Sequence, residues 1–282
     1  MNKIILVNKE KNYTSRDVVN IISKKFNTKK VGHFGTLDPL ATGLLVIGIG
    51  AFTKLGNLLE NDTKEYICEV LIGKSTTTYD ITGDITKEQS NYSLTKETLE
   101  KTLKTFEKEY LQQVPIYSAV KVNGKKLYEY ARNNIPVNPP NKKVQIFNIS
   151  LINFKDNYFT FSCKVSKGTY IRSLINDISK TLNIPMCMNN LKRTKQDIFS
   201  IKNSYTLEEI LNDNYKLLDL EDIYNIKKIE IPEQLKTKIT NGSLIDNIYS
   251  EDMIIFTKNN NNYVLYTKYS KDSTKMKPYL FF

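Results

Sequence analysis

The sequence is poor in the side chains that bind metals or form disulfide bridges. It contains one histidine, His33, and three cysteines, Cys68, Cys163 and Cys187, and no Cys-x-x-Cys spacing. This set lacks the ligands of a histidine–cysteine zinc site and shows no paired disulfide framework. We therefore expect no metal and three reduced, mostly buried thiols, as is typical of a cytoplasmic protein.

Long hydrophobic runs are absent as well. The most apolar stretch, 44–52, contains two glycines and is far shorter than the roughly 20 residues that span a bilayer. The apolar run at 4–7 is too short for the core of a signal peptide. The sequence therefore predicts no membrane segment and a cytoplasmic location.

Positive charge is present in excess. The chain has 41 Lys and Arg against 30 Asp and Glu, which gives a net charge of +11 over 282 residues. Such a balance favours polyanionic partners through counterion release and steered encounter. Charge alone does not distinguish a nucleic acid from an anionic membrane or from a role in solubility.

Hydrophobic periodicity predicts a mixed fold. Helices are expected from Ser15, as N-cap, from Thr95, and around 174–182. Strands are expected at 4–7, directly after a loop at 31–43, at 66–72 and at 159–165. Because strands and helices mix without a regular βαβ alternation, we expect an α+β fold with a central, mostly antiparallel sheet flanked by helices.

A smaller module is expected at the carboxyl end. A boundary is plausible at 225–232, and beyond it two strand-like runs, 253–256 and 263–269, flank a turn at 259–262. These runs predict a hairpin in a β-rich module. We therefore divide the chain into a large domain over 1–228 and a module over 231–282.

The loop at 31–43 carries one carboxylate in a rigid setting. Gly35 and Gly43 supply backbone freedom, while Pro39 restricts φ directly after Asp38. The loop should therefore hold the carboxylate of Asp38 in a defined direction. On local chemistry alone, Asp38 is more readily explained as a turn residue that accepts backbone N–H groups.

Four collinear blocks change that interpretation. The segment 33–43, HFGTLDPLATG, resembles the signature of the TruB family, the bacterial tRNA pseudouridine-55 synthases. The segments 113–121 with 124–132, QVPIYSAVK and GKKLYEYAR, resemble a second block of that family. KGTYIRSL at 167–174 and LKRT at 191–194 resemble a third and a fourth, in the family's order.

The resemblance implies a fold, a reaction and a catalytic centre. The fold would be that of a pseudouridine synthase with a small PUA-type RNA-binding barrel at the carboxyl end. Asp38 would be the nucleophile at C1′ of a T-loop uridine, and Arg172 the cation that keeps it ionised. Tyr66 would stack on the target base. The reaction needs neither metal nor organic cofactor.

Further residues match positions that bind the substrate in the family. Tyr170 and Leu191 would line the base pocket, although each would read as core packing in isolation. His33 would occupy the space left by the extruded nucleotide, and Lys54 would contact the RNA backbone. A basic cluster suits a phosphate track with Tyr128 and Tyr130 between its charges. Its members are Lys121, Lys125, Lys126, Arg132, Lys142 and Lys143.

Three positions depart from the family pattern. Glu10 stands where a proline is usual and Asn12 where a glycine is usual, and Asn tolerates a left-handed backbone. Thr77 stands where an aspartate is usual, while Asp80 nearby is retained. These changes bear on the positioning of the substrate more than on the reaction.

The expected partner is the T-arm of tRNA, bound by a monomer. Two alternatives stay open at this point. One is a tRNA-binding folding chaperone, although a binding protein has no need of a buried Asp38–Arg172 pair. The other is a synthase that acts on another RNA. The short chain without a basic tail favours a stand-alone tRNA enzyme.

Overall fold

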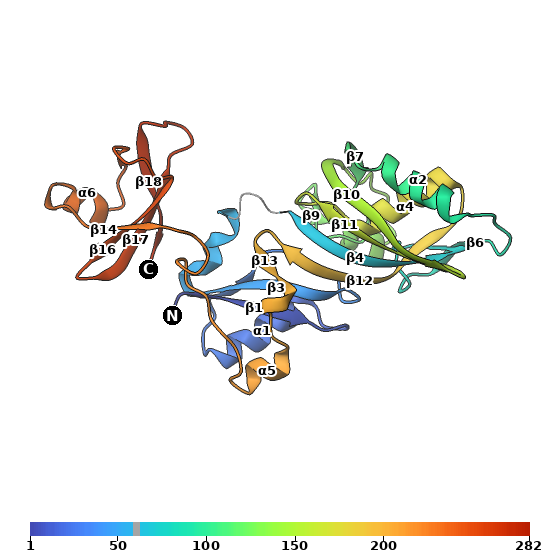
Figure 1. Cartoon of the computed structure of the whole chain (residues 1–282), viewed down its shortest axis with the longest axis horizontal. Helices are drawn as coiled ribbons and strands as arrows, with labels where there is room; N and C mark the ends of the chain where they lie inside the picture. Colours follow the sequence, from blue (N-terminus) through green and yellow to red (C-terminus); the bar gives the residue numbers. More distant parts are fainter. Residues whose placement is uncertain (59–62) are drawn as a thin grey trace.

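The computed structural model describes residues 1–58 and 63–282, which form two lobes (Figure 1). The larger lobe is built on a nine-stranded sheet of order β1-β3-β12-β4-β11-β10-β7, with β2 beside β3 and β13 beside β12. Among the described strands of this sheet, only β12 and β3 pair in parallel, so the predicted, mostly antiparallel central sheet is confirmed. The strands are β1 (Lys3–Lys9), β2 (Val31–His33), β3 (Thr42–Ile49), β4 (Lys64–Ile72), β7 (Glu109–Gln113), β10 (Asn141–Lys155), β11 (Tyr158–Val165), β12 (Met186–Gln196) and β13 (Phe199–Ser200).

Helices cover one face of this sheet and share a single core with it. They are α1 (Ser15–Lys25), α2 (Lys96–Thr105), α4 (Ile171–Leu182) and α5 (Leu207–Leu211). Thr95 caps α2 as predicted, but the N-cap of α1 is Thr14 and not Ser15. The hydroxyl of Ser15 faces the loop before β3 instead. No helix among the described residues is long and apolar enough to cross a membrane.

The strands β1 and β3 are buried on both faces, which explains why each reads as an unbroken apolar run. Ile5 and Val7 of β1 face the helices, whereas Ile4 and Leu6 face a second core on the other side. The carboxyl-terminal lobe helps to form this second core. The fully buried residues that it contributes are Ile255, Leu265 and Leu280.

The carboxyl-terminal lobe is a five-stranded sheet of order β14-β16-β17-β18-β15. The predicted hairpin is confirmed, since β16 pairs with β17 around Asn259 and Asn260, both with positive φ. The lobe's sheet begins at Lys227, because β14 pairs in parallel with β16. Its elements are β14 (Lys227–Glu230), η3 (Glu233–Leu235), α6 (Lys236–Thr240), β15 (Ile245–Asp246), β16 (Met253–Lys258), β17 (Asn261–Lys268) and β18 (Lys275–Phe281).

Alternation along β16 and β17 divides the lobe's apolar residues between two cores. Ile254 and Phe256 pack in the lobe's own core with Ile239 of α6, while Ile255 between them packs in the core shared with β1 and β3. At the same junction the ring of Phe282 lies 5.9 Å from that of Phe52 in η1 (Gly50–Asn57). The two lobes are therefore joined by apolar packing as well as by the chain.

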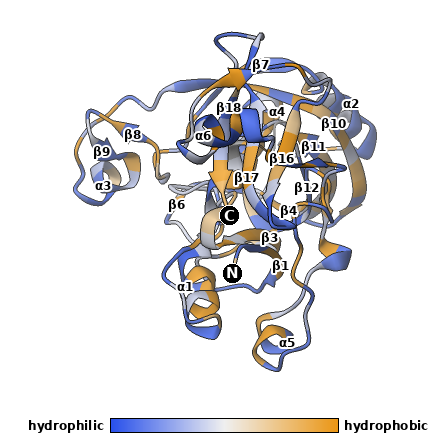
Figure 2. Ribbon diagram, turned by 90° about the vertical axis from the view of Figure 1, so that its left-hand side faces the viewer, coloured by the Kyte–Doolittle hydropathy of each residue, from blue (hydrophilic) through white to orange (hydrophobic). Residues whose placement is uncertain are grey.

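Smaller elements project from the larger lobe. The hairpin β8 (Lys121–Val122) and β9 (Lys125–Lys126) leads into α3 (Leu127–Arg132), and this arm stands away from the body in Figure 2. A second hairpin is formed by β5 (Lys74–Thr76) and β6 (Ile85–Glu88), and η2 (Ile201–Asn203) follows β13. Residues 121–132 are called the basic arm below.

Replacing Leu280 with alanine should lower the free energy of unfolding by about 2–5 kcal/mol, because its side chain is buried in the shared core. Urea unfolding followed by fluorescence and by far-ultraviolet circular dichroism would measure this loss. Leu244→Ala is the matched control, since Leu244 is 44% exposed in the same lobe. An equal loss in both variants would contradict a shared core.

Candidate active site

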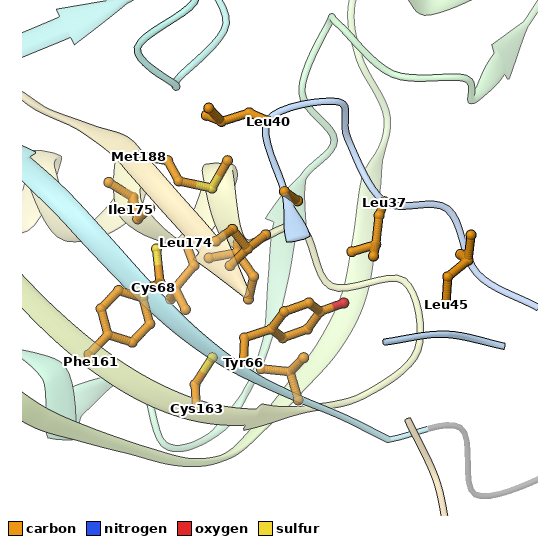
Figure 3. Close-up of a cluster of buried hydrophobic side chains, with 14 of the residues drawn as sticks. Leu37, Leu40, Leu45, Tyr66, Cys68, Phe161, Cys163, Leu174, Ile175 and Met188 are labelled. Atoms are coloured by element: carbon orange, nitrogen blue, oxygen red, sulfur yellow. The ribbon is translucent and has the colours of Figure 1, made fainter. Parts of the chain in front are cut away.

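The loop that carries Asp38 is fastened by buried side chains on either side of it. Leu37 and Leu40 are buried in the core shared by the sheet and the helices, and Figure 3 shows Leu37 near Tyr66 in that core. The hydroxyl of Ser15 accepts a hydrogen bond from the Leu37 amide at 2.9 Å and donates one to the Leu37 carbonyl at 3.1 Å. The Ala41 amide closes a turn onto the Asp38 carbonyl at 3.0 Å.

The carbonyl groups of the loop are satisfied by buried polar groups. Arg193, fully buried on β12, donates to the Gly35 carbonyl, and Gln196 donates to that of Phe34. The Asn12 amide donates to the Pro39 carbonyl at 2.8 Å. Asn12 has φ +72°, so the left-handed turn expected of asparagine at this position is confirmed.

Lys9 lies buried beneath the same loop. Its ammonium donates to the carbonyls of Glu10 and Tyr13 and, at 3.4 Å, to that of Pro39. Burial lowers the pKa of the Lys9 ammonium to about 8, although the nearby Asp38 carboxylate opposes this shift. Lys9 is not among the predicted site residues.

Asp38 and Arg172 form the ion pair that the sequence predicts. Nε of Arg172 lies 2.9 Å from Oδ2 of Asp38. The Arg172 side chain is 6% exposed, whereas that of Asp38 is 37% exposed. The guanidinium is therefore buried, while the carboxylate remains accessible to a ligand in solution. The remaining guanidinium nitrogens donate to the carbonyls of Thr78 and Tyr117 at 3.0 and 3.1 Å.

A second carboxylate supports the guanidinium. Oδ2 of Asp80 lies 3.9 Å from Nε of Arg172, and Asp80 is itself buried. Its other oxygen accepts from the Thr78 hydroxyl and from the amide of Thr82. Each of the three guanidinium nitrogens of Arg172 therefore has a hydrogen-bond partner, which restricts the planar group to one orientation.

A cavity of about 340 Å³ opens beside this ion pair. Aromatic and aliphatic groups line it, among them Tyr66, Tyr170 and Leu191, and lysines are also found in its wall. Burial raises the pKa of the Tyr170 phenol, so this ring is neutral at physiological pH. The lysines are Lys64, Lys142 and Lys167.

The register of three neighbouring strands places Tyr66 in the cavity wall next to the buried Arg193. Arg193 of β12 pairs with Gly43 of β3 and with Tyr66 of β4, so the three lie in one row across the sheet. Gly43 has φ +99°, and a Cβ atom there would lie 2.9 Å from the Arg193 amide nitrogen. Only glycine allows β3 to approach β12 so closely at this point.

The first turn of α4 presents both Tyr170 and Arg172, and a glutamine on β7 caps it. The Tyr170 amide donates to Oε1 of Gln112 at 2.8 Å, and Nε2 of Gln112 donates to the Tyr110 hydroxyl at 2.8 Å. That hydroxyl lies 3.4 Å from Oδ2 of Asp177 on α4. Gln112 is 1% exposed, so this relay fixes the start of α4 from within the protein.

Two predicted site residues lie outside the cavity. His33 ends β2 and does not line it, and burial together with Arg16 and Arg193 lowers the pKa of its imidazole. Lys54 is exposed on η1, beside the carboxyl-terminal lobe, where its carbonyl accepts a hydrogen bond from the Tyr279 hydroxyl at 2.7 Å. Neither residue contacts the space beside Asp38.

The predicted basic cluster is divided between two places. Most of it lies on the basic arm, where Lys126 and Arg132 lie 5.4 and 5.3 Å from the ring centre of Tyr128. Lys142 and Lys143 instead begin β10, and Lys143 is paired with Glu109 at 2.7 Å. The cluster is therefore not one uninterrupted track.

Comparison with known proteins assigns the chain to a family. Residues 23–171 match the amino-terminal domain of the TruB family pseudouridylate synthases. The chain belongs to the TruB family. It is 39% identical to tRNA pseudouridine synthase B of Clostridium tetani over 263 residues, which cover 90% of this chain and 91% of the relative. Its identity to the Oceanobacillus iheyensis protein of the same name is 39%, over 99% and 96% of the two chains.

Solved structures share the fold of this TruB family member. A chain in the crystal structure of a Cbf5–Nop10–Gar1 complex superposes with a TM-score of 0.68 at 21% identity, over 99% of this chain and 83% of that one. A chain from an H/ACA RNP bound to a substrate RNA containing 2′-deoxyuridine gives 0.67 at 19% identity, over 99% and 83%. The expected pseudouridine synthase fold with a β-rich carboxyl-terminal lobe is confirmed.

Replacing Gln112 with leucine should leave the Tyr170 amide without an acceptor and lower the free energy of unfolding by about 1–3 kcal/mol. Hydrogen exchange should accelerate at the Tyr170 amide, because its partner is the Gln112 side chain. Gln113→Leu is the control, since that side chain is exposed and the substitution keeps the backbone carbonyl that accepts from Ser173. Unchanged exchange at Tyr170 would argue against the cap.

Replacing Lys9 with methionine should remove a pH dependence of stability. The pKa of Lys9 is about 8 in the folded chain against an ordinary 10.5, so between these values the unfolded chain holds a proton that the folded chain has released. Wild-type stability relative to Lys9→Met should therefore rise with pH across this window. Urea unfolding of both proteins at several pH values would measure it, and a flat difference would contradict the assignment.

Proposed function

We propose that this chain is a tRNA pseudouridine synthase that isomerises a T-loop uridine, of the position-55 type, with Asp38 as nucleophile. The observation that carries the proposal is an accessible carboxylate paired with a buried guanidinium at the wall of a nucleoside-sized cavity. The relatives named tRNA pseudouridine synthase B support the substrate class. The reaction consumes no second substrate, because the product is an isomer of the uridine.

The chemistry requires a negative charge beside C1′ of the ribose. As the bond from N1 of uracil to C1′ breaks, C1′ becomes electron-deficient, and a carboxylate can attack it as in glycosidases. The charge-assisted hydrogen bond from Arg172 holds the Asp38 carboxylate in one orientation for this attack. The uracil then turns over, and C5 bonds to C1′ as the bond between C1′ and the Asp38 carboxylate breaks. The proton on C5 is released, N1 gains one, and the carboxylate is regenerated.

The aromatic wall of the cavity suits the detached base. We assign stacking on the uracil to Tyr66, and the shape of the pocket to Tyr170 and Leu191. The target nucleotide must leave the stack of the T-loop to reach this cavity, because C1′ is inaccessible within a stacked loop. A base that is enclosed by apolar groups stays in place while it turns.

The remaining assignments concern the rest of the tRNA. We propose that the T-arm docks along the basic arm, that Lys54 contacts its backbone, and that His33 occupies the space vacated by the extruded nucleotide. The module at 231–282 would bind the RNA as a PUA-like domain, next to a catalytic domain over 1–228. We propose a cytoplasmic monomer.

Asp38→Asn should abolish turnover while RNA binding persists. The amide is a poor nucleophile, so the single-turnover rate on unmodified tRNA should fall by about 10³-fold or more. Pseudouridine would be detected by carbodiimide labelling, and Kd by filter binding, where a change below about threefold is expected. Asp84→Asn is the control because Asp84 is exposed on a turn of the same lobe.

The same pair of variants separates the enzyme from a folding chaperone. Full turnover by Asp38→Asn would exclude the proposed mechanism. Loss of turnover with intact tRNA refolding would show that a chaperone activity, if present, is distinct. A wild-type protein that modifies another RNA but not tRNA would place the same chemistry on a different substrate.

A further inference from the structure

Lys142 reaches across a glycine into the wall of the cavity. Its ammonium lies over the backbone of Gly168, so closely that a Cβ atom at position 168 would collide with Nζ and Cε of Lys142. Gly168 has φ +82°, a left-handed conformation that a side chain would also disfavour. The missing side chain at 168 therefore provides the space that Lys142 occupies.

Lys143, the next residue along β10, differs from Lys142 in its direction and in its charge partner. Side chains alternate along a strand, so Lys142 and Lys143 point in opposite directions from β10. Lys143 is neutralised by Glu109 at 2.7 Å. The ammonium of Lys142, by contrast, forms no ion pair or hydrogen bond with any part of the chain that the structure describes. An ammonium without a carboxylate partner is available to an anion.

The wall around Lys142 divides into chemically distinct parts. Lys142 and Lys167 flank Gly168, and the aromatic groups Tyr66 and Tyr170 belong to the same cavity. The carboxylate of Asp38 is the acidic group in its wall. A nucleotide consists of an apolar base, a sugar and an anionic phosphate, and these three parts match the aromatic, carboxylate and lysine regions.

We propose that Lys142, lying across Gly168, binds a backbone phosphate of the target nucleotide. The inference rests on the proposed function and assigns one ligand to one lysine of the predicted cluster. A point charge on a flexible stem suits a phosphate that arrives as the nucleotide is extruded. Lys142 thereby binds the phosphate of the nucleotide, while Asp38 attacks C1′ of its ribose.

Neutralising either the lysine or the phosphate should have the same effect. Lys142→Ala should weaken binding of a T-arm stem-loop RNA by about tenfold, the usual range for one charge-assisted contact. The slope of log Kd against log salt should become shallower by about 0.7–0.9, as expected for one lost phosphate contact. Lys143→Ala, the matched control, should change neither quantity appreciably.

A methylphosphonate RNA identifies the partner atom. Stem-loops would carry one neutral methylphosphonate, either 5′ or 3′ of the target uridine, with a 2′-O-methyl group on the preceding nucleotide that is also present in the charged counterparts. Wild type should lose about tenfold in affinity for one of these two RNAs. On that RNA, Lys142→Ala should bind no more weakly than wild type, because the contact is already absent.

The outcomes distinguish this inference from the proposed function. Additive losses from Lys142→Ala and from both methylphosphonates would overturn the phosphate contact, as would equal losses in Lys142→Ala and Lys143→Ala. Affinity is measured without turnover, so a wild-type protein that forms no pseudouridine would reject the proposed function and leave the contact testable.

Discussion

The pairing of Asp38 with Arg172 is the interaction on which the site depends. The carboxylate belongs to the loop between β2 and β3, and the guanidinium to the first turn of α4, 134 positions later. A buried guanidinium without its partners would be strongly destabilising, so the loop, α4 and the turn that carries Asp80 must meet at one point. The cavity is what remains between them. Lys9 and Gln112 act at a distance from this point, one beneath the loop and the other at the start of the helix.

Much of the fold follows from local patterns. The apolar runs, the helix cap at Thr95 and the carboxyl-terminal hairpin all appear as predicted, because each depends on residues close together in sequence. The sequence predicts the N-cap of α1 at Ser15, one residue late, since Thr14 and Ser15 are both good caps. Ser15 is instead required by the loop at Leu37, a contact that no local pattern reveals.

The residues of the site that belong to sequence motifs were predictable. Those that support the site through tertiary packing were not. Asp38, Tyr66, Arg172, Tyr170 and Leu191 line one cavity, as the family motifs led us to expect, and their catalytic roles stay predictions. The supporting polar groups could not be inferred in the same way. A buried lysine or glutamine in a strand looks like any other polar residue until the register of the sheet and the direction of its side chain are known.

The hydrogen bond from Tyr279 to the Lys54 carbonyl has a consequence for how shortened forms of the protein behave. It connects the backbone of η1 to β18, so the carboxyl-terminal lobe stabilises the conformation of η1 in the other lobe. Removing the lobe would loosen η1 and uncover the apolar faces of β1 and β3. A truncated chain could therefore lose affinity for RNA even if the deleted lobe never touches a nucleotide, and weak binding by such a chain is not proof of a direct contact.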